Sequence, residues 1–174
     1  RGGEDGSRAA PNHLTFSPDG SRLAVGGDVG VKIFDVDSGD VLAWLQHGDH
    51  VRVLSISFSP DGERLASCGI SNAVQDGGDL AIDGRVLVFN LGSNAVVLEM
   101  LVAIDGGKLD RLRQVAYSTD GTRIVVCGAE NEMCKFARGG GYSIFDAATG
   151  SLMSSAKMGR IATAHFSQCD RFIV

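Results

Sequence analysis

The chain has 174 residues, of which 44% are hydrophobic and 21% are charged, with 24 glycines and only 6% aromatic residues. This composition excludes a disordered chain, and abundant glycine with few aromatic residues favours short strands joined by tight turns. The net charge of −5 argues against a general nucleic-acid binder, because affinity for a polyanion needs clustered lysine and arginine. No apolar run approaches the roughly 20 residues that cross a bilayer.

The N-terminal residues 1–12 contain a single Arg-Gly-Gly triplet and no signal-peptide pattern. We expect them to form a flexible tail or linker. Because the first residue is Arg1 and not methionine, we also expect the chain to be a fragment or a processed form.

A strand, a tight turn and a return strand then recur four times. The turns read Phe-Ser-Pro-Asp-Gly at 16–20 and 58–62, Tyr-Ser-Thr-Asp-Gly at 117–121, and Phe-Ser-Gln-Cys-Asp at 166–170. Apolar residues alternate with polar ones before each turn, which is the period of a strand with one buried face. Proline presets φ for such a turn, and glycine adopts the left-handed conformation that closes it.

Two further strands complete each unit. Third strands are predicted at 31–35, 86–90 and 142–146, and a fourth strand is clearest at 40–45. Four antiparallel strands in a unit of about 42 residues, the spacing of Phe16 and Phe58, predict a β-propeller blade. We therefore expect an all-β fold, a partial β-propeller of about three and a half four-stranded antiparallel blades. The expected blades are about 13–52, 53–112, 113–160 and, in part, 161–174.

These units resemble the blades of WD-repeat β-propellers over about residues 13–174. The Trp-Asp pair of that family corresponds here to Phe34-Asp35, Phe89-Asn90 and Phe145-Asp146. The resemblance assigns structural roles to Asp28 and Asp83, which match the family's aspartate before the third strand, whereas Gly139 stands at that place in the third unit. It also implies a hydrogen-bond set of His50, Ser67 and Asp83, which is incomplete because Phe89 has no indole N–H.

Three segments are longer than their counterparts in the first unit: 70–83, 129–140 and 103–113. The resemblance implies that all three emerge on one face of the propeller. Long loops on a rigid scaffold usually carry binding residues, although each segment taken singly also fits a neutral surface insertion. The candidate partner-binding residues are Asp76, Asp79, Lys108, Arg111, Met133, Lys135, Phe136 and Arg138.

This mixed-charge set suits a protein partner whose charges set orientation and association rate. Met133 and Phe136 either supply an apolar anchor for that partner or pack under their own loop. We expect a non-catalytic scaffold that binds a protein or peptide through the loop-rich face. The alternative is a propeller enzyme or small-ligand-binding domain with its site at the central channel, near residues such as His165.

No motif for a cofactor or a metal is recognised. The four cysteines, at positions 68, 127, 134 and 169, lack zinc-ligand spacing, and the acids of 76–84 lack EF-hand spacing. We expect reduced thiols, no cofactor and no membrane or nucleic-acid partner, in a protein of the cytoplasm, with the nucleus as an alternative. Further blades of this chain or of another chain are expected to close the ring, and the chain alone is expected to associate.

Overall fold

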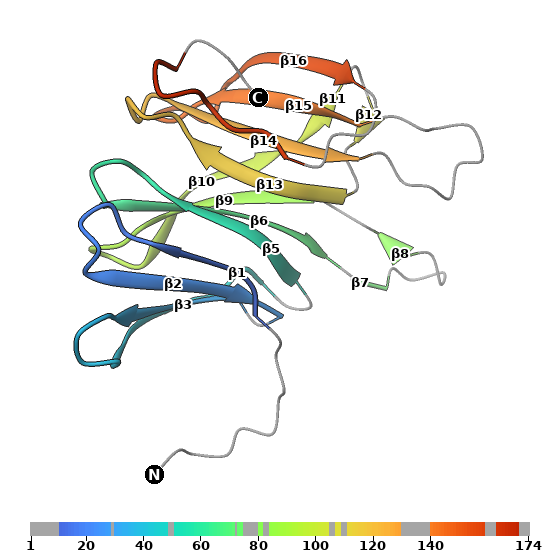
Figure 1. The fold of residues 1–174 in the computed structure, drawn as a ribbon. Coiled ribbons are helices and arrows are strands. Elements are labelled where there is room, and N and C mark those ends of the chain that lie inside the picture. Colours follow the sequence, from blue (N-terminus) through green and yellow to red (C-terminus); the bar gives the residue numbers. More distant parts are fainter. Residues whose placement is uncertain are drawn as a thin grey trace.

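The computed structural model describes residues 11–28, 30–48, 51–71, 73–74, 80–81, 84–104, 107–108, 111–129, 140–158 and 163–170. Within these ranges the chain forms strands and turns and no helix. Three four-stranded antiparallel sheets follow one another along the chain and lie in a row (Figure 1). The predicted all-β architecture of four-stranded antiparallel blades is confirmed.

The first blade has the strand order β1-β2-β3-β4, and the third has β13-β14-β15-β16. In the second blade the order is β5-β6-β9-β10, because the short hairpin β7–β8 intervenes between β6 and β9. A second short hairpin, β11–β12, lies between the second and third blades in the sequence.

The strands of the first blade are β1 (Pro11–Phe16), β2 (Arg22–Gly27), β3 (Gly30–Asp35) and β4 (Val41–Leu45). Those of the second blade are β5 (Val51–Phe58), β6 (Arg64–Ser71), β9 (Gly84–Asn90) and β10 (Ala95–Leu101). Those of the third blade are β13 (Arg111–Tyr117), β14 (Arg123–Ala129), β15 (Gly140–Asp146) and β16 (Leu152–Met158). The hairpin strands are β7 (Ala73–Val74), β8 (Leu80–Ala81), β11 (Ala103–Ile104) and β12 (Gly107–Lys108).

β1 begins at Pro11, two residues before the boundary that the sequence suggested for the first blade. The side-chain amide of Asn12 donates a hydrogen bond of 2.9 Å to the carbonyl of Val53 in the second blade. Pro11 and Asn12, the last two residues of the expected tail 1–12, are therefore part of the sheet, and residues 1–10 lie outside the described residues.

The tight turns form for local reasons. In the first turn the Ser17 hydroxyl donates to the Asp19 carboxylate at 2.6 Å and accepts from the backbone N–H of Arg22 at 2.9 Å. Gly20 closes the turn with a φ of 73°, a conformation that glycine adopts without strain. Ser59 with Asp61 and Ser118 with Asp120 repeat these side-chain hydrogen bonds.

Apolar side chains fill the space between neighbouring blades. Ile33 of the first blade and Phe89 of the second lie in one buried cluster, and Val88 and Val126 lie in the cluster between the second and third blades. Burying a side chain of this size stabilises a fold by about 1.5–3 kcal/mol. The innermost strand β5 lies between β1 and β13, so the blades are stacked with their inner strands side by side.

Residues 163–170 continue this arrangement beyond the third blade. Ala164 is buried with Val125 and Cys127, and Phe166 packs against the same cluster. The backbone N–H of Asp170 donates to the Ser167 carbonyl at 2.9 Å, as Gly20 does to Ser17 at the same distance. This segment therefore covers the outer side of the third blade in the manner of a further blade.

Candidate interaction surface

The two short hairpins lie at the same end of the blades. β7–β8 follows the end of β6, and β11–β12 precedes the start of β13. Because β5 and β6 run antiparallel, as do β13 and β14, this end is opposite to the tight turns that join those strands. Figure 1 shows both hairpins at the right-hand end of the sheets, with β11 beside β15. We call this end the loop-rich face.

Two of the eight candidate partner-binding residues have a described backbone. Lys108 ends β12 and pairs with Ala103, and Arg111 begins β13 and pairs with Ala129. Both positions lie at the loop-rich face. The remaining six, Asp76, Asp79, Met133, Lys135, Phe136 and Arg138, lie outside the described residues, so their assignment stays a prediction.

Asp28, for which the sequence suggested a structural role, lies at the same face, after the end of β2. Its carboxylate forms an ion pair with Arg52, with 3.1 Å between Oδ1 and Nε. Arg52 also donates to the side-chain carbonyl of Asn12 at 2.9 Å. Asp28 therefore helps to join the first blade to the second. Exposed pairs of this kind contribute about 0–1 kcal/mol.

In the second blade Ser67 is buried, and its hydroxyl donates to the Leu87 carbonyl at 3.5 Å. His50 and Asp83, its expected partners, lie outside the described residues. The histidine found beside Ser67 is His47, whose Nε2 lies 3.5 Å from the Ser67 carbonyl oxygen and whose ring is 6.4 Å from that of Phe89. The sequence reasoning did not select His47. In the sequence His47 is marked only by its place directly before Gly48, two residues after the end of β4, and its contacts with Ser67 and Phe89 emerge only in the fold.

The environment of His47 indicates a packing role. The side chain is buried, and this burial lowers the pKa of its imidazole below the ordinary value of 6.5. This favours the neutral ring, which lies against Phe89 in the second blade while its Nε2 faces the Ser67 carbonyl oxygen.

Comparisons with known proteins agree with this geometry. Residues 41–90 match the family model described as "WD domain, G-beta repeat". The "Structure of U3-55K" matches with a TM-score of 0.65 and 17% identity, covering 86% of this chain and 40% of that chain. The "Crystal structure of RRP9 WD40 repeats" matches with a TM-score of 0.65 and 18% identity, covering 86% of this chain and 39% of that chain. This chain has a WD40 β-propeller fold.

The predicted resemblance to WD-repeat propellers is thus confirmed, with a recognisable repeat at 41–90. The chain spans about two fifths of the length of these two WD40 structures. A sequence search of curated proteins finds no match. At such identities the likeness establishes the fold, so the function of this chain is argued from its residues.

The innermost strands of neighbouring blades are joined by hydrogen bonds from backbone N–H groups to polar side chains. Ser55 and Ser57 accept hydrogen bonds from the backbone N–H groups of Val115 and Tyr117, at 3.3 and 3.1 Å. His13 Nδ1 lies 3.4 Å from the backbone nitrogen of Ile56 and accepts from it. These side chains satisfy backbone N–H groups that the sheet ladders leave without partners.

The third junction between inner strands uses Gln114. Its side-chain carbonyl accepts from the backbone N–H of Ala164 at 3.1 Å, and its amide nitrogen lies 2.8 Å from Nε2 of His165. His165, the residue named for the channel-site alternative, is exposed and is engaged with Gln114.

The buried thiols are poorly suited to nucleophilic chemistry. Cys68 and Cys127 are free and buried, and burial raises the pKa of both, that of Cys127 to about 11. Among the described residues no group of three or more His, Cys, Asp or Glu side chains is placed to hold a metal ion. In the same ranges no helix is long and apolar enough to cross a membrane.

Proposed function

We propose that this WD40 chain is a non-catalytic interaction scaffold that binds a protein or peptide at its loop-rich face. The observation that carries the proposal is the placement of β7–β8 and β11–β12 at one end of adjacent blades. The blades beneath them are held by fully buried clusters and by hydrogen bonds between inner strands. Loops on such a rigid support are positioned for binding without a large ordering cost.

The chemistry proposed for this face is a mixed-charge surface. Lys108 at the end of β12 and Arg111 at the start of β13 are the two cations of this proposed surface whose backbone is described. Asp76 and Asp79 add acids from the neighbouring segment, and Met133 with Phe136 adds apolar groups. A partner with complementary charges would be oriented by this pattern, and its apolar groups would supply most of the affinity.

The proposal includes a non-catalytic role. Some polar side chains of the inner strands, among them Ser57 and Gln114, form hydrogen bonds between blades. Such groups are not available to activate a substrate without loosening a blade junction. The buried, protonated thiols Cys68 and Cys127 give no nucleophile either.

We further propose that the scaffold acts inside the cell, in the cytoplasm or the nucleus, and that additional blades of this or another chain complete the ring. The free thiols Cys68 and Cys127, buried on neighbouring blades, support a reducing compartment. The coverage of only two fifths of the matched propeller chains supports additional blades.

A charge-reversal experiment tests the binding face. The immobilised chain is used to capture partners, which are identified by mass spectrometry, purified and titrated against the chain. Lys108→Glu combined with Arg111→Glu is expected to weaken binding by about tenfold or more. The matched control is Glu63→Lys, which changes an exposed charge in a tight turn at the opposite end.

A loop replacement provides the second arm. Ala129 and Gly140 pair at the end of the β14–β15 ladder, so residues 130–139 can be replaced by Asn-Gly, the preferred two-residue hairpin loop. We expect this variant to lose partner binding and to keep the melting temperature of the parent chain. Unchanged affinity in both the charge-reversal and the loop variant would contradict the proposal.

A further inference from the structure

The outer strand of each described four-stranded blade carries a β-bulge at the same position. In β10, Val96 pairs with Phe89 and the next pair skips Val97, which is therefore an extra residue of the strand. The corresponding extra residues are Leu42 in β4 and Met153 in β16. A bulge leaves its extra residue out of the pairing of the two strands. All three blades therefore present an apolar side chain at the same place on their outer edges.

The side chains at these bulges are exposed to solvent. Leu42 is 51% exposed, Val97 is 45% exposed and Met153 is 57% exposed. The residues that precede two of them, Val96 and Leu152, are 46% and 53% exposed. We call these five residues the apolar rim: Leu42, Val96, Val97, Leu152 and Met153.

The exposure of Val96 and Leu152 does not come from the lack of a neighbouring blade. Val96 pairs with Phe89, which is buried against the first blade, and Leu152 pairs with Phe145, which is buried against the second. Directly paired residues project from the same side of a sheet, so a blade packs on the side of each. Their exposure therefore comes from their place at the outer margin of the sheet. Val41, at the equivalent position of β4, is not counted because no described blade packs on its side.

The rim residues of the second and third blades lie close together across the blade junction. A Cβ at Gly150, in the turn before β16, would lie 3.6 Å from Cδ2 of Leu98 in β10. Leu98 directly follows Val97, and Leu152 lies two residues after Gly150. The exposed apolar groups therefore form one surface across the junction, unlike the scattered single residues that are ordinary on protein surfaces.

The turns that lead into the outer strands are acidic. These turns are residues 35–40, 90–95 and 146–151. They hold no lysine or arginine and four acidic residues, Asp35, Asp37, Asp40 and Asp146. Asp37 and Asp40 are exposed, and backbone N–H groups that bind the carboxylates of Asp35 and Asp146 lower the pKa of both. One margin of the apolar rim is therefore negatively charged.

The apolar rim lies at the opposite end of the blades from the loop-rich face. The first residue after a tight turn pairs with the last residue of the third strand, as Arg64 does with Asn90 and Arg123 does with Asp146. The outer strands, which follow the third strands, therefore begin at the end where the tight turns lie. Binding at the rim is thus a second function of the scaffold, at a site other than the one proposed above.

We propose that the apolar rim binds an amphipathic helix of a partner protein that carries lysine or arginine along one flank. The apolar side chains of the helix contact Val97, Leu152 and Met153, and its cations lie beside the acidic turns. The bulges disfavour an added strand, because they interrupt the regular edge on which a strand would pair. The acidic turns disfavour an anionic lipid surface, which they would repel.

The probe is a labelled helical peptide of about 18 residues, composed of leucine and lysine with the leucines on one side. Fluorescence anisotropy follows its titration with the chain, and we expect a Kd of about 1–50 µM. A peptide with glutamate in place of lysine is expected to bind about tenfold more weakly or less. The same weakening is expected for a peptide of unchanged composition in which the leucines do not form a stripe.

Matched variants locate the apolar contact. Val97→Asn combined with Met153→Asn removes apolar side chains without changing charge, and it is expected to weaken peptide binding about tenfold. The control is Leu101→Asn combined with Met158→Asn, two similarly exposed apolar residues at the other ends of the same strands, and it is expected to stay within about twofold of the parent chain. Circular dichroism and thermal melting check folding, and Leu152→Asn replaces the first variant if that variant does not fold.

A second pair of variants tests the charge. Asp37→Asn combined with Asp40→Asn is expected to weaken binding of the leucine–lysine peptide about threefold. Lys108→Glu combined with Arg111→Glu makes the loop-rich face more acidic, and its affinity for the peptide is expected to stay within about twofold of the parent chain. Attraction to net charge alone would instead tighten binding in this variant, and such tightening overturns the proposal.

The other outcomes are also decisive. The proposal is overturned if the parent chain does not bind the leucine–lysine peptide at about 100 µM, or if it binds the peptide without a leucine stripe equally well. Equal affinity of the parent chain and the Val97–Met153 variant overturns it as well. Two other occupants are tested without peptide. Retention of the chain on vesicles of phosphatidylserine and phosphatidylcholine, or self-association that the Val97–Met153 variant loses, assigns the rim to a membrane or a second copy and overturns the proposal.

Discussion

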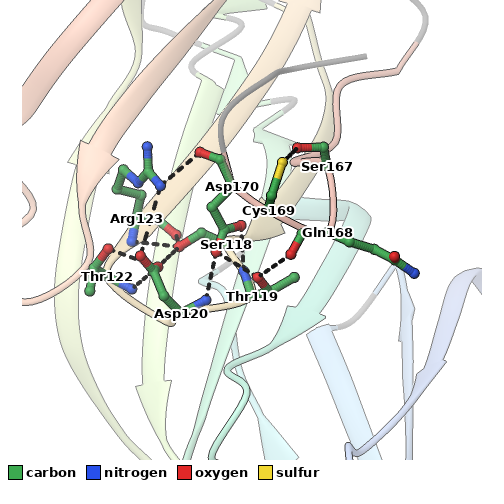
Figure 2. Close-up of polar contacts among 9 residues, drawn as sticks. All are labelled: Ser118, Thr119, Asp120, Thr122, Arg123, Ser167, Gln168, Cys169 and Asp170. Atoms are coloured by element: carbon green, nitrogen blue, oxygen red, sulfur yellow. Dashed lines mark hydrogen bonds and ion pairs between the residues drawn. The ribbon is translucent and has the colours of Figure 1, made fainter.

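The carboxylate of Asp170 accepts hydrogen bonds from Thr119 across the junction between the third blade and the following segment (Figure 2). The backbone N–H of Thr119 lies at 2.8 Å and its hydroxyl at 2.5 Å, and the N–H of Asp120 donates to the same carboxylate at 2.9 Å. Asp170 has a φ of 53°, in the left-handed region that glycine holds in the other tight turns.

Other junctions are built from different residues at the same two positions. There Pro18 faces Gly62 and Pro60 faces Gly121, and a Cβ at Gly121 would lie 3.4 Å from Cδ of Pro60. Proline has no N–H to donate, whereas Thr119 has one. The two departures from the repeat, threonine for proline and aspartate for glycine, therefore compensate each other.

This pairing predicts a non-additive mutant cycle. Thr119→Pro and Asp170→Gly should each lower the melting temperature, because each removes both hydrogen bonds between Thr119 and the Asp170 carboxylate. The double variant restores the proline–glycine contact of the other junctions and should recover about half or more of the combined loss. Thermal unfolding followed by circular dichroism measures the effect, with Gln168→Ala as the control in the same turn. Strict additivity of the two losses would show that the residues are not coupled.

The tight turns predict a specific loss of stability in acid. Asp19 accepts hydrogen bonds from the Ser17 hydroxyl and from a backbone N–H, and Asp120 accepts the equivalent bonds from Ser118 and a backbone N–H. These hydrogen bonds lower the pKa of each carboxyl from 3.8 to about 2. Because these pKa values are lowered in the folded state, the carboxylates stabilise it above pH 3.8, and this contribution is lost as the pH falls toward 2.

Asp19→Asn with Asp120→Asn should therefore be less stable than the parent chain at neutral pH and lose less stability between about pH 4 and pH 2. Urea unfolding at a series of pH values measures this, with Asp37→Asn as a control in an exposed turn. Parallel pH profiles for the parent chain and the double variant would contradict the turn assignment.

The blade junctions predict that Arg22 stabilises the fold through both of its contacts. Arg22→Met keeps the apolar stem but loses the hydrogen bond to Gly62 and the stacking on Phe58, and it should lower the free energy of unfolding by about 1–2 kcal/mol. Arg113→Met, at an exposed position in β13, should change it by less than about 0.5 kcal/mol. Urea unfolding provides both values, and equal effects of the two substitutions would refute a role for the junction.

The sequence was sufficient to predict the blades because their determinants are local. The alternation that ends at Phe58 and the turn from Ser59 to Gly62 each specify structure within a few residues. The turn after the third strand is local as well, since Gly39 and Asn94 hold the same place in two blades and both have positive φ.

Features set by long-range contacts were not predicted. The extension of β1 to Asn12 is supported by contacts of Asn12 with Val53 and Arg52, some 40 positions along the chain. The hairpins β7–β8 and β11–β12 have two-residue strands, which are too short to show an alternating pattern. His47 is identified by its contacts with Ser67 and Phe89, which spacing alone does not reveal.

The stacking of blades by their inner strands is tested most directly by amide hydrogen exchange at Tyr117. Its N–H donates to the Ser57 hydroxyl of the neighbouring blade at 3.1 Å. We predict that this amide is protected in the parent chain and that Ser57→Ala raises its exchange rate about tenfold, while the β13–β14 ladder amides keep their protection. An unprotected Tyr117 amide in the parent chain, or protection that is unchanged in Ser57→Ala, would contradict the packing of the blades.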